Sequence, residues 1–251
     1  MSFSQTVILG GLAGLTIFLG LPVARLRLAS RQYLSLLNAF AIGILLFLFV
    51  DIMEHAVTPV EEALEEGEPA FLLLLLILAL GFGAGLLSLV YYGQHFLRNG
   101  ESMRRLALLI AVGIGLHNFS EGLAIGTSAR AGELALAMTL VVGFGLHNAT
   151  EGFGIAAPLT DEKNVSWGFL ALCGLIAGGP VLLGTVVGFS YTSELLSVLF
   201  LALAGGAIIY VVNELFGAGR KLGAPGWAGW GITAGILLGF ITEFILEAVG
   251  G

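Results

Sequence analysis

The sequence predicts an all-α integral membrane protein with eight transmembrane helices. Of its 251 residues, 57% are hydrophobic and only 11% are charged, whereas a typical soluble domain has about 25% charged residues. The apolar residues form blocks of the length that a helix needs to cross a bilayer, which is about 20 residues. The regular alternation of apolar and polar residues that is typical of a membrane β-barrel is absent, so the blocks are expected to be helical.

The eight expected spans follow one another closely, so residues 1–251 are expected to form a single transmembrane domain. The linkers between the spans are too short to hold a soluble domain. No basic segment with a small-residue cleavage site precedes the first span, so we expect no removable signal peptide. The expected spans are residues 5–24, 33–54, 70–92, 106–128, 132–157, 165–189, 193–217 and 226–249.

Basic residues indicate how these spans are oriented. If the spans alternate in direction, nine of the ten lysines and arginines fall on one side of the membrane and only Arg130 falls on the other. The positive-inside rule makes the first side cytoplasmic. Both termini are then expected on the extracellular or periplasmic side, together with an acidic loop at 61–68. That loop is either a solvated polar segment or a surface that attracts cations.

Charge and cysteine content exclude two other classes of protein. The formal net charge is −7, which argues against nucleic acid as a partner, because nucleic-acid-binding surfaces are basic. The single cysteine, Cys173, falls inside the sixth expected span. It therefore excludes both a disulfide framework and a cluster of thiolate ligands. The lipid bilayer is the first partner that the composition predicts.

A repeated motif carries the chemistry of the sequence. The segment GIGLHNFSEGLAIG at 113–126 returns thirty residues later as GFGLHNATEGFGIA at 143–156, with eight of fourteen positions identical. Because the fourth and fifth spans are consecutive, they run antiparallel, and each copy lies near the middle of its span. The two copies are therefore expected to face each other at mid-depth, where transporters place their binding sites.

Each copy brings an imidazole, an amide and a carboxylate together on its helix. Histidine and glutamate are four residues apart and share a helix face, and asparagine precedes the glutamate by three residues. Two buried carboxylates repel each other, and a divalent cation removes that repulsion because it binds carboxylate and neutral imidazole directly. The expected metal ligands between the fourth and fifth helices are His117, Asn118, Glu121, His147, Asn148 and Glu151.

The donor atoms indicate which ions such a site would hold. Imidazole suits zinc, iron, copper and nickel, whereas carboxylate and amide oxygens suit harder ions. The mixture predicts Zn²⁺, Fe²⁺ or a similar divalent ion, bound as substrate and with no other cofactor, and the lack of sulfur argues against Cu⁺. Two alternatives stay open from the residues alone: polar residues with a packing role, and a proton or sodium relay without a transition metal.

An intramembrane metal-dependent hydrolase is the main alternative function. Such an enzyme needs three protein ligands, an open position for water and a general base. The sequence has no HExxH motif, and six convergent ligand candidates leave little need for water. The sequence therefore predicts a transporter and not an enzyme.

The paired HNxxEG motifs, the eight-span pattern and the short chain resemble the ZIP (Zrt/Irt-like) family of metal transporters, and small bacterial members most closely. The resemblance covers essentially the whole chain. It implies transport of divalent metal ions toward the cytoplasm across the cell (inner) membrane by alternating access. Zn²⁺ is the first expected substrate, with Fe²⁺, Mn²⁺ and Cd²⁺ as alternatives. It also implies a sliding motion of spans 1, 4, 5 and 6 as one unit, and it leaves a homodimer open.

Three acids outside the repeat are candidates for the transport pathway. The resemblance implies roles for Asp51 and Glu214, whereas Glu54 is either a helix-end residue at the membrane interface or part of an entry relay. Asp51, at the outer end of the second span, falls where the family often has a polar residue of the outer vestibule. Glu54 lies beside it, as does His55. Glu214, in the seventh span, matches an acid toward the cytoplasmic exit. Asp51, Glu54 and Glu214 are therefore the expected residues of the transport pathway.

Two departures from the family pattern bear on the site. Ser120 and Thr150 stand directly before the motif glutamates, where the family usually has proline, so the helix kink that proline would cause is not expected. Gly179 precedes Pro180 in the sixth span, where relatives often have a glutamate that completes a second metal subsite. The sequence therefore predicts one bound metal ion per site and not two.

Overall fold

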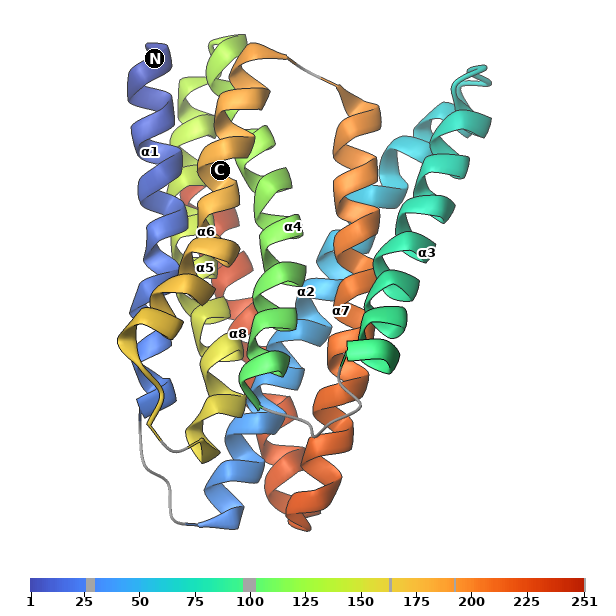
Figure 1. The fold of residues 1–251 in the computed structure, drawn as a ribbon. Helices are drawn as coiled ribbons and strands as arrows, with labels where there is room; N and C mark the ends of the chain where they lie inside the picture. Colours follow the sequence, from blue (N-terminus) through green and yellow to red (C-terminus); the bar gives the residue numbers. More distant parts are fainter. Residues whose placement is uncertain (26–29, 97–102, 163, 192, 251) are drawn as a thin grey trace.

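The structure is a computed structural model that describes residues 1–25, 30–96, 103–162, 164–191 and 193–250. These residues form a bundle of long helices (Figure 1). The long helices are α1 (Phe3–Leu15), α2 (Arg31–Glu65), α3 (Phe71–Phe96), α4 (Met103–Ala131), α5 (Leu134–Ala156), α6 (Trp167–Ser190), α7 (Glu194–Leu222) and α8 (Pro225–Gly250). The 3₁₀ helices η1 (Thr16–Leu19) and η2 (Leu21–Arg25) continue α1, and η3 (Ala157–Asp161) continues α5.

The prediction of an all-helical membrane protein is confirmed. Over the described residues, seven segments are long and apolar enough to cross a membrane: α1 with η1 and η2, then α2, α3, α4, α6, α7 and α8. The remaining long helix, α5, has 23 residues and packs against α1, α2, α4 and α8 within the same bundle. The described chain thus holds seven helices that meet the criteria for a span, where the sequence predicts eight.

Helix ends alternate between the two ends of the bundle (Figure 1). The N-terminus and the turns from α2 to α3 and from α4 to α5 lie at the upper end in that view, and α2, α4, α6 and α8 all begin at the lower end. Six of the described basic residues belong to helix ends at the lower end: Arg25, Arg31, Arg104, Arg105, Arg220 and Lys221. Which side of the membrane each end faces stays a prediction from this charge pattern.

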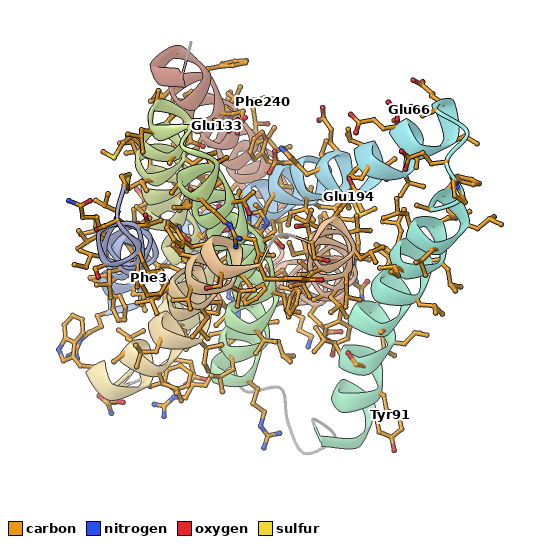
Figure 2. The ribbon with its side chains drawn as sticks, turned by 90° about the horizontal axis from the view of Figure 1, so that it is seen from above. Phe3, Glu66, Tyr91, Glu133, Glu194 and Phe240 are labelled. Carbon is orange, nitrogen blue, oxygen red and sulfur yellow. The ribbon has the colours of Figure 1, made fainter. Side chains whose placement is uncertain are left out.

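The helices form two groups of four. α1, α4, α5 and α6 pack mainly on one another, with α4 against α6 as the most extensive pair. α2, α3, α7 and α8 form the second group, in which α2 packs along α8 and α3 along α7. Seen from above, α3 lies at the far edge of the second group, away from Phe3 of α1 (Figure 2). The groups meet where α4 contacts α7 and where α5 contacts α2 and α8.

Rows of glycines, at which the backbone of one helix contacts the backbone of the next, hold each group together; we call these rows glycine seams. A Cβ added at Gly122 of α4 would collide with the backbone of α6, and one added at Gly184 of α6 would collide with the backbone of α4. In the second group, Gly235 of α8 is packed against the backbone of α2 in the same way. Small residues allow this close approach, which stabilises helix pairs in lipid, where the hydrophobic effect does not bring helices together. Each group is therefore joined backbone to backbone.

The contact between the groups is made by side chains. A Cβ at Gly113 of α4 would lie 3.5 Å from the Cβ of Ala207 on α7, which is an ordinary van der Waals distance. The rings of Phe119 on α4 and Phe200 on α7 are in contact at a tilt of 31°, with centroids 4.2 Å apart. The first group contains the four spans that the family resemblance implies as a sliding unit, and its border with the second group is less tightly interlocked than its interior.

Candidate metal site

The helices α4 and α5 bring the two motif copies together in the interior of the bundle. His117, Asn118 and Glu121 on α4 are buried, with at most 5% of each side chain exposed, and Asn148 and Glu151 on α5 are fully buried. Burial of α4 follows from its glycine seam, which presses it against α6. Five of the six predicted ligands therefore lie in the interior. The sixth, His147, belongs to α5, but its side chain lies outside the described part of the structure.

Two asparagines join the motif copies crosswise. Asn118 Nδ2 on α4 donates a hydrogen bond to Glu151 Oε2 on α5 at 3.1 Å. Asn148 Nδ2 on α5 donates to Glu121 Oε2 on α4 at 3.2 Å. A further hydrogen bond from Asn118 Nδ2 to Asn148 Oδ1 connects the two amides. The two copies of the motif thus make equivalent contacts, because the glutamate of each helix accepts a hydrogen bond from the asparagine of the other.

The helix α6 reaches this network through its backbone. Asn118 Nδ2 also donates to the carbonyl oxygen of Ala177 at 3.1 Å. Gly179 is about 200° further around the helix than Ala177, at roughly 100° per residue. It shares that outer face with the exposed Leu175 and Leu183, and a Cβ at Gly179 would meet nothing within 4 Å. A side chain at position 179 would point away from the motif, so the interpretation of Gly179 as a missing second-subsite ligand does not hold in this fold.

The oxygen atoms of the network favour a cation. His117 Nε2 and Glu121 Oε1 are 3.3 Å apart, in the four-residue spacing that the sequence predicts. Among the described residues, neither Glu121 Oε1 nor Asn118 Oδ1 accepts a hydrogen bond. Buried oxygens without a donor are costly, and a cation or a water molecule relieves that cost. Both atoms are thus suited to bind one.

The described carboxylates and imidazoles do not by themselves complete a metal site. Among those side chains, no three histidine, cysteine, aspartate or glutamate groups lie close enough together to hold one ion. The amide oxygen of Asn118 and the side chain of His147 are further donors of the predicted set. A cation at the motif would therefore draw on both kinds of donor, amide oxygen included.

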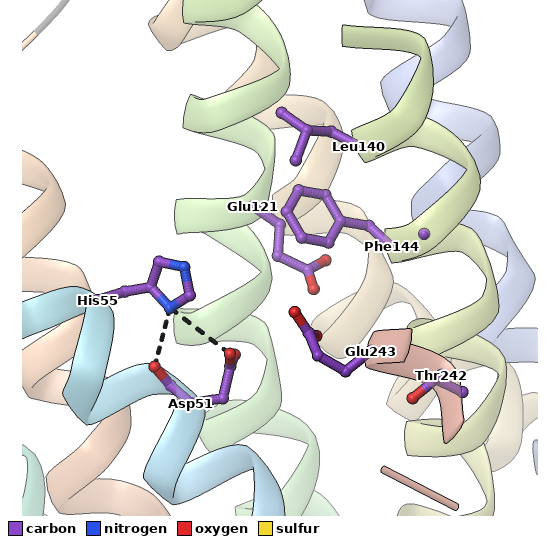
Figure 3. Close-up of a pocket in the computed structure, with 8 residues that line it drawn as sticks. Asp51, His55, Glu121, Leu140, Phe144, Thr242 and Glu243 are labelled. Carbon is purple, nitrogen blue, oxygen red and sulfur yellow. Dashed lines mark hydrogen bonds and ion pairs between the residues drawn. The ribbon is translucent and has the colours of Figure 1, made fainter. Parts of the chain in front are cut away.

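A cavity of about 90 Å³ has Glu121 in its wall (Figure 3). It lies between the two helix groups, because its walls come from α4 and α5 on one side and from α2 and α8 on the other. In Figure 3 the carboxylates of Glu121 and Glu243 point toward each other, with Asp51 and His55 beside them. The lining residues are Asp51, His55, Glu121, Leu140, Gly143, Phe144, Thr242 and Glu243.

Comparisons with known proteins identify the family. A sequence model described as ZIP zinc transporter matches residues 94–216, which contain both motif copies. The zinc transporter ZupT of Escherichia fergusonii and that of Escherichia coli K12 are each 29% identical to this chain, over 98% of it and 99% of their own length. The chain is a member of the ZIP family. In this ZIP protein the two motif copies that carry the resemblance are also joined to each other by the hydrogen bonds of Asn118 and Asn148.

The predicted outer pathway residues of the ZIP chain line two adjoining spaces. Asp51 lies on the wall of the 90 Å³ cavity, and Glu54 lies on a wider cleft of about 580 Å³ that shares Asp51, His55 and Glu243 with it. His55 Nδ1 is 2.9 Å from the backbone oxygen of Asp51 and 3.5 Å from its carboxylate Oδ1. The sequence leaves the role of Glu243 open, although an acid within an apolar span is a signal, and the structure places it on the walls of both spaces.

In the lower half of the bundle, apolar core residues of the ZIP chain separate the motif from the lower end. A cavity of about 140 Å³ lies there between α2, α4, η3 and α7, and its walls include Asn38 and Lys221 but no motif residue. The buried core residues Leu45, Ile114 and Ile155 lie between that cavity and the motif along their helices. Glu214 is half-buried on α7 and is not among the residues that line the cavity. Over the described residues, the motif thus borders the cavity at its upper side and is separated from this lower cavity by apolar core.

Proposed function

We propose that this ZIP-family protein carries divalent transition-metal ions, with Zn²⁺ as the main substrate, toward the cytoplasm across the inner cell membrane. The observation that carries the proposal is the crosswise pair of motif copies with a cavity that reaches Glu121. The relatives named as zinc transporters support Zn²⁺. The hydrolase alternative is not supported, because the matched proteins are transporters.

The cation binds between α4 and α5 as substrate. The carboxylates of Glu121 and Glu151 balance its two charges, and neutral imidazole from His117 and His147 gives the site its preference for zinc over harder ions. Asn118 adds an amide oxygen that accepts no hydrogen bond from the described residues. Because imidazole must be neutral and carboxylate ionised to bind a metal, proton uptake by these groups assists release.

The path to and from the site follows the border between the helix groups. A cation passes the carboxylates of Asp51 and Glu243, loses water in the cavity and binds at Glu121. The first helix group then moves against the second, which parts the apolar layer around Ile114 and opens the lower end. Glu214 receives the ion on that side. This is alternating access around a site near the middle of the membrane, and the side-chain border between the groups supports it.

Metal uptake into proteoliposomes tests the proposed function. We expect saturable uptake of Zn²⁺ by vesicles that contain the purified protein, with weaker uptake of Fe²⁺, Mn²⁺, Cd²⁺ and Co²⁺ measured one at a time. Empty vesicles of the same lipid serve as the control for leakage. The proposal fails if none of the five ions enters protein-containing vesicles faster than it enters empty ones.

Cysteine labelling tests the orientation. In a Cys173→Ala background, Glu65→Cys in the acidic turn is expected to react with a membrane-impermeant thiol reagent added outside intact cells, whereas Arg220→Cys at the opposite end is expected to react only after the cells are opened. Both positions are exposed, and Cys173 is buried, so neither burial nor the native thiol confuses the result. The reverse labelling pattern would place the termini in the cytoplasm.

A further inference from the structure

We propose that Asn148 is a positioning residue, whose amide nitrogen holds the carboxylate of Glu121 in place, and that Asn148 does not itself bind the transported cation. The inference deepens the proposed function, on which it rests, because it assigns different roles to two asparagines that the sequence repeat makes equivalent. It replaces the expectation that both amides are metal ligands.

Both ends of the Asn148 amide are occupied. Its nitrogen donates to Glu121 Oε2 at 3.2 Å and to the carbonyl oxygen of Phe144 at 2.7 Å, and its oxygen accepts from Asn118 Nδ2. The side chain is fully buried, so water cannot replace a lost partner cheaply. A rotated amide would turn its oxygen toward the oxygens of Glu121 and Phe144. A cation at Asn148 would share its oxygen with the hydrogen bond from Asn118 or, with the amide rotated, would cost both hydrogen bonds that the nitrogen donates.

Asn118 is arranged differently, although it occupies the same place in its motif. Its nitrogen faces three acceptors, one each from Asn148, Glu151 and Ala177. Its oxygen accepts no hydrogen bond from the described residues. Asn118 can therefore bind a cation through oxygen while its nitrogen keeps its partners. Among the described residues, Asn118 hydrogen-bonds to the backbone of α6 and Asn148 does not, and this difference distinguishes the two repeats.

Glu121 is the group that gains from Asn148. One of its oxygens, Oε2, is held by the asparagine, while Oε1 accepts no hydrogen bond from the described residues and lies 3.3 Å from His117 Nε2. Glu121 also lines the 90 Å³ cavity, together with Asp51 and Glu243 (Figure 3). The hydrogen bond from Asn148 thus fixes the carboxylate in the wall of the cavity and leaves one oxygen for the arriving cation. A hydrogen bond to a charged group is among the stronger kinds in proteins.

Two variants of Asn148 separate positioning from metal binding. Asn148→Leu has neither donor nor acceptor, and Asn148→Asp keeps an oxygen but cannot donate to Glu121. We expect both to lower the melting temperature of the metal-free protein. We also expect Asn148→Leu to raise the Zn²⁺ concentration for half-maximal uptake about tenfold, as the loss of one hydrogen bond to a charged group would, with a smaller change in the maximal rate.

The matched control is Asn38→Leu. Asn38 is a buried asparagine that donates to the backbone of Leu215 at 3.0 Å, far along the chain from the motif. Its replacement is expected to lower the melting temperature without changing the zinc concentration for half-maximal uptake. A purely structural role of Asn148 would give that same result, and the proposal would then be wrong.

A ligand role would also be visible. If metal-free Asn148→Asp or Asn148→Leu melted at the temperature of the unmodified protein while zinc uptake weakened, Asn148 would be a metal ligand and the inference would be overturned. Asn148→Ala repeats the comparison should the leucine variant not fold. Failure of the proposed function has a different signature, because the unmodified protein would then show no zinc-dependent rise in melting temperature.

Discussion

Replacement of Glu121 or Glu151 by alanine is expected to abolish saturable zinc uptake while the protein stays folded. Each change removes one of two anionic donors that balance the charge of the cation, and loss of a group that merely orients a metal ligand already costs about 10- to 100-fold. The loss is therefore expected to exceed about 100-fold. Uptake is measured in proteoliposomes with equal amounts of protein, and helicity is checked by circular dichroism.

Glu133→Ala is the matched control for these variants. Glu133 lies at the upper end of the bundle directly before α5, and its side chain is exposed. Its replacement removes the same charge from the protein without touching the motif. Near-normal uptake by both motif variants, at normal expression, would refute the assignment of the two glutamates as ligands.

Addition of a single methyl group on α6 is expected to change the stability of the protein very differently at two glycines that look alike in the sequence. A Cβ at Gly184 would collide with the backbone oxygen of Phe119 on α4, whereas a Cβ at Gly179 would meet open space. Overpacking typically costs about 1–3 kcal/mol, and the cost is expected at the upper end of that range because backbone cannot move aside. Gly179→Ala is expected to be neutral or to stabilise by up to about 1 kcal/mol through helix propensity.

Thermal unfolding of the two purified variants in one detergent measures this difference. We expect Gly184→Ala to melt well below the unmodified protein and Gly179→Ala to melt at or slightly above it. Because the two positions share one helix, differences in expression or detergent affect both equally. Equal melting temperatures would mean that α4 and α6 are not held together by this seam.

The helix α2 extends beyond the membrane span that hydropathy predicts for it. The sequence predicts a span at 33–54, and the helix instead continues through Pro59 to Glu65. Charges at Asp51 and Glu54 end the apolar block and hence the expected span, but the last five residues of the helix, 61–65 (EEALE), are good helix formers and need no lipid to stay helical. The length of the apolar block predicts where the chain leaves the membrane, whereas helix propensity predicts where the helix ends. These two boundaries differ in α2.

The site was partly predictable for a related reason. Spacing of four residues predicts that His117 and Glu121 share a face, as the 3.3 Å between His117 Nε2 and Glu121 Oε1 bears out, and the repeat predicts that a second pair faces it. Periodicity gives the face of a helix but not the partner of each atom, so the crosswise hydrogen bonds of Asn118 and Asn148 could not be foreseen. The contribution of Glu243 depends on packing between α8 and α5, which lie far apart in the sequence.

The length of α2 decides what the acidic turn at its end can do. With 35 residues, the helix measures about 50 Å at 1.5 Å per residue, whereas the hydrocarbon core of a bilayer is about 30 Å thick. Glu65 stands roughly 21 Å along the helix beyond Asp51, and Figure 2 shows Glu66 far to the side of the first helix group. Physiological salt screens charges over about 8 Å. The turn therefore gathers cations around itself but not at the cavity mouth, where Asp51 and Glu243 supply the negative charge.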